Sequence, residues 1–338
     1  MIRMIFIYSG VLAANFFASG AFADSKPTVN QQNFIRAETD NMYAAMVENA
    51  GGTNRLYHFR TPTPLDKQTV IRMNRDVLYS GGVFDAKDSV TVSFPTLPDD
   101  RYASVYIIDN DHYVVDIIHE PGTHQVKGET QYLYIIIRIQ VKDSSNKEEI
   151  AMINALQDQF KVTSKTMNEF QGFLWDRDSL NAQRSIYEEA SKEYDSWAGM
   201  MGKRGEVNEQ TRHLAAASAW GLLPEYEATY LNYQPTGANP EKCYFAKYLV
   251  PENKGFWSIT VYGDDGFMKS DNNVFNEANT TLNNDGTFDA YFGSEKVCGN
   301  VVNRVDTSEG WNFLFRIYRP GEKVLDGTYS LPNVSIYR

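Results

Sequence analysis

The stretch that decides the fold most clearly is GFWSITVYGDDGF, at residues 255–267. Its first part, residues 256–262, carries the aromatic and β-branched side chains that favour an extended strand. The following segment, residues 263–266, is typical of a turn, because glycine and aspartate tolerate the backbone conformations that turns require. Three further strand-like runs lie at residues 243–250, 287–292 and 311–318. The carboxyl-terminal part of the chain is therefore predicted to form a β domain.

The amino-terminal half shows a similar rhythm after one helix, which the spacing of apolar positions predicts at residues 30–49. Strand-like runs follow at residues 70–73, 78–84, 89–94, 102–109, 113–118 and 132–141. In the middle of the chain, apolar steps of three and four return and predict helices at residues 146–161, 178–203 and 207–222. The sequence therefore predicts a mainly β (α+β) protein with two β-sandwich-like domains joined by a helical segment.

The predicted domain bounds follow from these changes of rhythm. They are residues 24–145 for an amino-terminal helix plus the first β domain, 146–230 for the helical connecting segment, and 231–338 for the second β-sandwich-like domain.

The first residues of the chain, 1–23, have the pattern of a secretory signal peptide. Arg3 is followed by an apolar run of about fourteen residues and then by Ala21-Phe22-Ala23 ahead of Asp24. The alternative is an uncleaved membrane anchor, but a run of this length falls short of the ~20 residues that span a bilayer. We therefore expect cleavage after Ala23, a periplasmic or secreted protein, and no membrane insertion after cleavage.

Charge and cysteine content narrow the classes of partner. The chain has a formal net charge of −11, and the loss of Arg3 would make it more negative. Such a surface repels nucleic acid, so no nucleic-acid partner is expected. Cys243 and Cys298 are the only cysteines. In an oxidising compartment this even count favours one disulfide, which would contribute ~4 kcal/mol on a chain-entropy model; the alternative is two separate buried thiols.

Three stretches together resemble a bacterial family that carries paired domains of unknown function. NRDVLYSGGVFD at residues 74–85 and DRYASVYIIDNDHY at 100–113 resemble the first domain, DUF1254. GFWSITVYGDDGF and FRIYRPGEKVLDGTYSLP, at 255–267 and 315–332, resemble the second, DUF1214. RHLAAASAWGLLPEYEATYLN at 212–232 resembles the segment that joins them. The resemblance implies an exported protein with two β-sandwich-like domains bridged by helices.

The resemblance implies little about activity, because the family is named for lacking an assigned one. Some members carry the label carboxylesterase. An esterase of the α/β-hydrolase type needs a G-x-S-x-G string at a strand-to-helix turn, and this sequence has none. Nor does the sequence contain a phosphate-binding glycine motif, so no nucleotide cofactor is expected.

One polar stretch contains a candidate divalent-metal site. Residues 109–124 hold Asp109, His112, His119 and His124, and imidazoles and carboxylates are the ligands that zinc, iron and manganese prefer in proteins. Strand geometry works against the set, because His112 and His119 are seven residues apart and an odd separation points them to opposite faces. The alternative interpretation is that these histidines lie on the surface or in turns without a ligand role.

A second polar cluster, Arg75, Asp76 and Tyr79, opens an otherwise apolar strand. Adjacent opposite charges often form a structural ion pair. In a binding role, the guanidinium would hold a carboxylate or phosphate through two parallel hydrogen bonds, and the phenol would donate a proton or a stacking face. This cluster is therefore a candidate ligand-binding site.

His213 and Trp220 share one face of the predicted helix 207–222, near the seam between the domains. A buried histidine is often a satisfied core residue, but small-molecule sites concentrate at domain seams. We therefore take Trp220 as a ligand-binding candidate, and His213 and His112 as catalytic candidates.

The sequence supports three hypotheses of function. The leading one is a protein of unassigned activity that binds a small molecule at the cleft between its domains. The second is a metal-assisted hydrolase or lyase, in which His213 acts as the base. The third is a structural or assembly protein of the cell envelope. The sequence does not indicate an oligomeric state.

Overall fold

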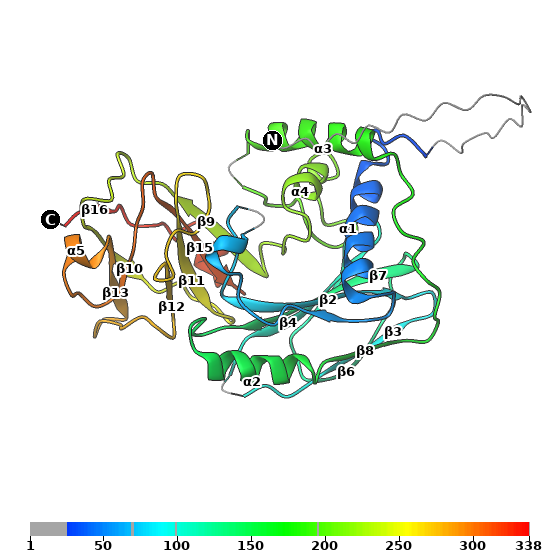
Figure 1. Cartoon of the computed structure of the whole chain (residues 1–338), viewed down its shortest axis with the longest axis horizontal. Coiled ribbons are helices and arrows are strands. Elements are labelled where there is room, and N and C mark those ends of the chain that lie inside the picture. Colours follow the sequence, from blue (N-terminus) through cyan, green and yellow to red (C-terminus); the bar gives the residue numbers. More distant parts are fainter. Residues whose placement is uncertain (1–25, 69–70, 99, 195, 338) are drawn as a thin grey trace, which may run out of the picture.

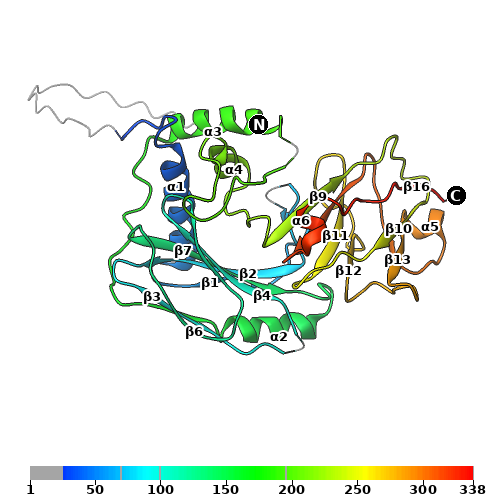
Figure 2. The ribbon, with the colours of Figure 1, turned by 180° about the vertical axis from the view of Figure 1, so that it is seen from behind.

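The computed structural model describes residues 26–68, 71–98, 100–194 and 196–337. The predicted signal peptide, residues 1–23, lies outside these ranges. Two groups of sheets lie side by side in the molecule, as Figures 1 and 2 show from opposite sides. Among the described residues, no helix is long and apolar enough to cross a membrane.

The first sandwich packs a five-stranded antiparallel sheet against a three-stranded one (Figure 1). In sheet order, the larger sheet contains β1 (Tyr57–His58), β2 (Val77–Asp85), β7 (Tyr132–Gln140), β4 (Ala103–Asp109) and β5 (Val114–Ile118). The smaller contains β6 (Gly122–Val126), β3 (Val90–Phe94) and β8 (Lys161–Ser164). Valine, isoleucine and leucine dominate the core between the sheets. The helix predicted at residues 146–161 ends earlier, at Gln157, and β8 begins at the last residue of that predicted range, Lys161.

Strand alternation decides which side chains face the sandwich core and which face the site. On β7, Leu133, Ile135, Ile137 and Ile139 belong to the core between the two sheets. Tyr134, Ile136 and Arg138 alternate with them and so point to the opposite face. β2 behaves likewise, with Leu78 and Phe84 in the core and Tyr79 on the opposite face. The five-stranded sheet therefore presents a mixed polar and aromatic face to the rest of the molecule.

Helices cover part of that face. α1 (Phe34–Ala50), α3 (Arg177–Ser191) and α4 (Arg212–Ser218) pack together there, and α2 (Lys147–Gln157) lies on the other side of the sheet (Figure 1). Asn146 caps α2, because its side chain accepts from the backbone N–H groups of Glu148 and Glu149. A short 3-10 helix, η1 (Leu65–Lys67), lies between β1 and β2.

Two sequence predictions for the segments around this face are wrong. The helix expected at residues 178–203 ends at Ser191, and residues 196–211 form turns and loops apart from a bridge at Lys203. The strand expected at residues 70–73 is a turn in its described part, where Arg72 adopts a left-handed backbone conformation with φ of 55°. Both segments line the pocket described below.

The second sandwich consists of two four-stranded sheets. One contains β14 (Arg304–Val305), β13 (Thr287–Phe292), β10 (Tyr244–Leu249) and β16 (Ser335–Ile336). The other contains β12 (Val274–Asn276), β11 (Trp257–Tyr262), β15 (Asn312–Tyr318) and β9 (Ala228–Tyr233). Two short helices, α5 (Glu295–Cys298) and α6 (Glu322–Leu325), complete it. Its core is aromatic where the first is aliphatic. The mainly β prediction is confirmed.

The predicted disulfide between Cys243 and Cys298 is confirmed. It ties the residue before β10 to the last residue of α5, across a sequence separation of 55. The two sandwiches meet through a separate buried cluster that includes Tyr102 and Tyr106 of the first. The ring of Tyr102 contacts those of Phe256 and Tyr318 of the second.

Candidate functional site

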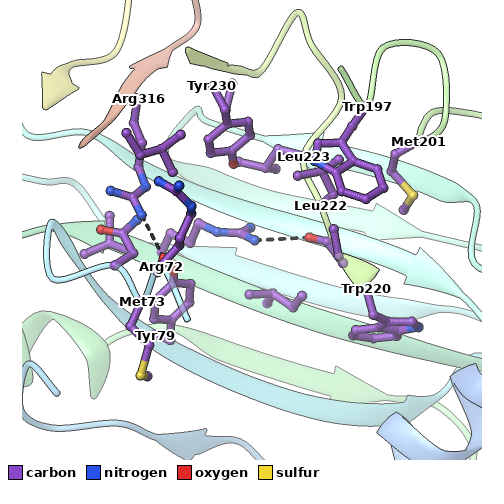
Figure 3. Close-up of a pocket in the computed structure, with 18 of the residues that line it drawn as sticks. Arg72, Met73, Tyr79, Trp197, Met201, Trp220, Leu222, Leu223, Tyr230 and Arg316 are labelled. Atoms are coloured by element: carbon purple, nitrogen blue, oxygen red, sulfur yellow. Dashed lines mark hydrogen bonds between the residues drawn. The ribbon is translucent and has the colours of Figure 1, made fainter. Parts of the chain in front are cut away.

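A large pocket lies at the joint between the two sandwiches (Figure 3). Its volume is about 1070 Å³. The floor comes from β2 and β7 of the first sandwich, and one wall comes from β9 and β15 of the second. α1, the segments around residues 59–74 and 194–201, and the end of α4 supply the other walls. Residues far apart in the sequence therefore converge on one space, which is large enough for a small organic ligand.

The two ends of this pocket differ in chemistry. Figure 3 shows one end lined by Arg72, Met73, Tyr79, Tyr230 and Arg316. The same view shows the other end lined by Trp197, Met201, Trp220, Leu222 and Leu223. We call these the cationic end and the aromatic end.

Arg138 lies in the floor, on the middle of β7. It is only 7% exposed. Its guanidinium sits 5.5 Å from the ring centre of Tyr79 and 5.3 Å from that of Tyr106. Nη2 donates a long hydrogen bond of 3.5 Å to the carbonyl of Gly221, and Nη1 has no partner among the described residues. No carboxylate of the described chain forms an ion pair with it, so this cation is buried without a counter-ion.

A buried guanidinium without a counter-ion lowers the stability of the folded protein. The effective cost of burying an ion is several kcal/mol, and each cation–π contact returns only ~0.5–2 kcal/mol. Buried guanidinium groups are therefore normally paired. Arg138 departs from that rule, and it does so in the floor of a pocket.

Arg316, on β15, is the opposite case. It is 2% exposed, and its donors are used. Nη1 donates to Thr260 at 2.8 Å, while Nη2 donates to the hydroxyl of Tyr262 at 2.7 Å and to the backbone carbonyl of Arg72 at 2.9 Å. Nη1 also lies 3.8 Å from the carboxylate of Asp76. Arg316 thus joins β11 and β15 of the second sandwich to the loop before β2.

The Asp76–Arg316 pair is fully enclosed. Burial raises the pKa of Asp76, while Arg316 and the hydroxyl of Ser258, which donates to the carboxylate, act to lower it; the net direction is upward. Burial lowers the pKa of Arg316, but Tyr262 and Asp76 outweigh it, so that guanidinium stays charged. The pair therefore forms a polar contact between the two sandwiches, with Arg316 in the pocket lining and Asp76 behind it.

Arg72 lies beside Arg316 at the cationic end (Figure 3). Its guanidinium stands 5.5 Å from the ring centre of Tyr262, and its Nη1 has no partner in the described part of the chain. Burial lowers the pKa of Arg72, and the nearby Arg316 acts in the same direction. A second cation with a free donor therefore lies next to the pocket.

The tyrosines around these cations are neutral phenols at physiological pH. Burial raises the pKa of Tyr230 to about 12 and holds those of Tyr106 and Tyr318 well above their ordinary value. Tyr318 accepts a hydrogen bond of 2.7 Å from Asn74. None of these rings supplies negative charge to the arginines.

The aromatic end is held by ring contacts rather than by charges. His112 stacks on Trp220 at 5.3 Å between ring centres, and its Nε2 accepts a hydrogen bond of 3.1 Å from the backbone N–H of Gly221. Burial lowers the pKa of His112 to about 3, with a smaller contribution from Arg212, so the imidazole is neutral. His112 therefore supports Trp220 from behind.

The charge of the lining is opposite to that of the whole chain. Among the described residues that line the pocket, the charged ones are Lys67, Arg72, Arg138 and Arg316 on the basic side, and Glu225 on the acidic side. The chain as a whole has a net charge of −11. The pocket is thus a positive region inside an acidic protein, which favours anions over cations as ligands.

The structure separates the four predicted ligand-binding residues. Tyr79 and Trp220 line the pocket. Asp76 is buried behind the lining, where its carboxylate pairs with Arg316 and accepts a hydrogen bond from Ser258. Arg75 pairs with the exposed carboxylate of Asp271 at 2.8 Å and does not pair with Asp76. The cluster is split because Arg75 and Asp76 lie in the irregular segment before β2, with a bend at Asp76, and only Tyr79 lies on the strand itself.

Neither predicted catalytic histidine lies on the pocket surface. His112 is buried behind Trp220. His213 packs on Tyr187 at 4.2 Å, in the helical layer, and burial lowers its pKa. Their catalytic roles stay predictions.

The predicted metal ligands do not gather. Asp109 pairs with Arg204 at 2.9 Å, His119 lies 2.9 Å from Glu227, and His124 lies 2.8 Å from the carbonyl of Glu120. Within the described ranges, no three histidine, cysteine or acidic residues form a group that could hold a metal. His112 lies before β5 in a left-handed backbone conformation and His119 follows β5, whose pairing with β4 has a register shift. The two side chains therefore meet different partners, Trp220 and Glu227. The metal hypothesis stays a prediction without a preformed site in this part of the chain.

Sequence reasoning missed the arginines of the pocket. Arg138 and Arg316 each interrupt an otherwise apolar strand, YLYIIIRIQV at residues 132–141 and FLFRIY at residues 313–318. A charge in such a strand must be paired or functional, and this signal was available. Trp197 and Met201 fall within the helix predicted at residues 178–203, but they line the pocket from a loop.

Fold and pocket together define a class of protein: two β-sandwiches with a large cationic and aromatic pocket at their joint. Residues 53–129 match the family described as "Protein of unknown function (DUF1254)", and residues 233–322 match "Protein of unknown function (DUF1214)". The chain therefore carries both domains, in the order that the resemblance predicted.

Solved structures show the same fold. The VPA0106 protein from Vibrio parahaemolyticus is similar with a TM-score of 0.69 at 15% identity, over 90% of this chain and 97% of that one. An uncharacterized protein from Burkholderia cenocepacia is similar with a TM-score of 0.51 at 11% identity, over 90% of this chain and 87% of that one. No curated protein matches the chain. The comparisons thus support the architecture and assign no activity.

Proposed function

We propose that the protein binds a small organic molecule in the pocket at the joint of its two sandwiches. One observation carries the proposal: a cavity of about 1070 Å³ lined by both sandwiches and by the helical segment between them. Ligand pockets are typically a few hundred to about 1,000 Å³, mostly apolar, with a few polar groups in fixed positions. The aromatic end supplies apolar surface, and the cationic end supplies the fixed polar groups.

We also propose that this binding takes place outside the cytoplasm. The disulfide between Cys243 and Cys298 supports the proposal, because disulfides persist in oxidising compartments and are rare in the cytosol. A fusion to a reporter that is active only after export would test it, with the segment 1–23 deleted as the control.

A pocket-filling variant tests the binding function. The probe is N-phenyl-1-naphthylamine, an uncharged compound whose fluorescence rises in apolar surroundings. Leu222 is half-buried in the lining, so Leu222→Trp should occupy the space that the probe needs. We expect saturable binding to the wild type and at least roughly tenfold weaker binding to the variant, a loss of about 1.4 kcal/mol or more.

Leu249→Trp is the matched control, because Leu249 is 55% exposed on β10 and lies outside the lining. It adds the same side chain without filling the pocket, so the probe should bind it as it binds the wild type. If the two variants bind the probe equally, or if the wild type shows no saturable binding, the proposed function is wrong.

A further inference from the structure

The chemical class of the ligand can be read from the floor of the pocket. Arg138 and Arg316 are both buried arginines on sheet strands, yet only Arg316 has its donors used by protein groups. A buried guanidinium with a free Nη1 and no counter-ion in the described chain is in an incomplete environment. The missing partner is an acceptor with negative charge, since guanidinium donors bind such groups most strongly.

Arg72 gives a second, independent indication. Its Nη1 also has no partner among the described residues, and it lies beside another cation, Arg316. Two like charges held close together repel each other unless an anion lies near both. Among the described residues of the lining, the one acidic side chain is that of Glu225, which accepts a hydrogen bond of 3.0 Å from the backbone of Gly199 instead.

The shape of the pocket defines the rest of the ligand. Arg138 contacts Tyr79 at the cationic end and the carbonyl of Gly221, which adjoins Trp220 and Leu222 of the aromatic end. A negative group at Arg138 therefore has the aromatic end directly beside it. The volume left beyond the arginines is lined by indole, leucine and methionine side chains, which favour an apolar body.

Resting on the proposed binding function, we infer that the ligand is an amphipathic organic anion. Its oxyanion head, a carboxylate, sulfonate or phosphate, is received by the free donors of Arg138 with Arg72 as the second cation, and its apolar body lies in the aromatic end.

Matched pairs of probes isolate the charge. Dodecanoate and dodecan-1-ol share one chain length, and each is titrated against bound N-phenyl-1-naphthylamine at neutral pH. In a purely apolar pocket the alcohol would displace the probe better, because its head group costs less to desolvate. We expect the reverse: dodecanoate should displace the probe at a concentration roughly 10- to 100-fold lower than dodecan-1-ol does. Charge-assisted hydrogen bonds to arginine contribute a free energy of that size. A further pair, 1-anilinonaphthalene-8-sulfonate against the parent probe, repeats the comparison with a sulfonate.

Three variants locate the head group. Arg138→Met and Arg72→Met should each weaken dodecanoate and leave dodecan-1-ol unchanged, with the preference reduced to within roughly threefold in Arg138→Met. Arg55→Met is the control, because Arg55 is exposed and lies outside the lining. It should keep the full preference. Arg138→Met should be at least as stable as the wild type, because it removes a buried unpaired charge, and a purely structural arginine would give the opposite result.

The outcomes separate the two levels of the proposal. If both amphiphiles displace the probe equally from the wild type, the anion inference is overturned and the binding function stands. If the preference survives in both arginine variants, the assignment of the head group is overturned. If the parent probe does not bind at all, both fail. If Arg138→Met is less stable than the wild type or does not fold, the role of Arg138 as an unpaired cation is overturned. Arg72→Met, whose backbone carbonyl still holds Arg316, then tests whether the cationic end receives the head group.

Discussion

The two ends of the pocket are built on different physical principles. At the cationic end, Arg316 connects strands of the second sandwich with the loop before β2 through direct hydrogen bonds and through Asp76. At the aromatic end, Trp220 rests on His112, whose neutral ring accepts one backbone hydrogen bond. The cationic end is held by the ion pair of Arg316 and Asp76, and the aromatic end is held by the stacking of uncharged rings.

This difference shows where the structure can be altered. A buried ion pair contributes little more stability than apolar side chains in its place would. Removing one partner, however, leaves the other charge buried without a counter-ion, which is strongly destabilising. A stacked neutral histidine contributes stability through packing. That stability is lost as the pH falls, because protonation of the ring then favours the unfolded chain. The cationic end should therefore be sensitive to single substitutions, and the aromatic end to acid.

The largest effect is expected from Arg316→Met. The substitution leaves the carboxylate of Asp76, itself 2% exposed, without its cation. We expect the free energy of unfolding to fall by about 3–5 kcal/mol, measured by urea denaturation followed by circular dichroism. Adding Asp76→Asn to the variant should restore part of the loss, because the stranded charge is then gone. A loss below about 1 kcal/mol in the single variant would show that the pair does not hold the joint.

The second effect concerns acid and the aromatic end. The pKa of His112 falls to about 3 on folding because the ring is buried, against ~6.5 in the unfolded chain. Below pH 6.5 the imidazole of His112 is protonated in the unfolded chain but stays neutral in the folded protein. The free energy of unfolding therefore falls as the pH decreases below 6.5. Linkage gives roughly 1.4 kcal/mol per pH unit, or roughly 2.5 kcal/mol between pH 6.5 and 4.5.

His112→Asn provides the comparison. Asparagine tolerates the left-handed backbone at this position, where φ is 62°, and it does not titrate. The variant should start less stable but lose roughly 2.5 kcal/mol less than the wild type over the same pH range in urea denaturation. Parallel pH profiles for the two proteins would contradict the buried neutral ring. Asp76 should not add to the acid loss, since its raised pKa means that the folded state takes up its proton readily.

The third effect is on ligand affinity alone. Trp220→Phe removes part of the aromatic wall and should weaken N-phenyl-1-naphthylamine by about 1 kcal/mol, roughly fivefold. Trp175→Phe is the control, because Trp175 is also partly buried and hydrogen-bonded, through its donation to Asp40 at 2.8 Å, but lies outside the lining. Fluorescence titration of both variants decides the matter. Equal weakening in the two would mean that the probe senses general loosening rather than the wall.

Much of the fold could be predicted from the sequence because strand alternation is a local property. The apolar positions of residues 132–141 predict β7 and its core face without any knowledge of its neighbours. The disulfide was predictable because only two cysteines are present. Tyr79 and Trp220 were found as pocket residues because each stands out from an otherwise apolar or small-residue run.

The remaining pocket residues depend on contacts between distant segments. Trp197 and Met201 follow the spacing of a helix, yet the chain leaves α3 at Ser191 and carries them into the pocket. Nothing local distinguishes Arg138, which has no counter-ion among the described residues, from Arg316, whose partner Asp76 is distant in the sequence. Which arginine is satisfied depends on how the sandwiches dock, so the sequence pattern could indicate both arginines but not their different roles.

The smallest effect is expected from Arg75→Met, at the outer side of the cationic end. The side chain of Arg75 is 11% exposed, but it pairs with Asp271, whose side chain is 78% exposed, and an ion pair with a solvated carboxylate contributes only ~0–1 kcal/mol. We expect a change in unfolding free energy within about 1 kcal/mol and an affinity for dodecanoate within roughly twofold of the wild type. Asp271→Asn should behave in the same way. A loss of dodecanoate affinity as large as that of Arg138→Met would place Arg75 in the binding site with Arg138 and Arg72, and its pairing with Asp271 would then not keep it out of the pocket.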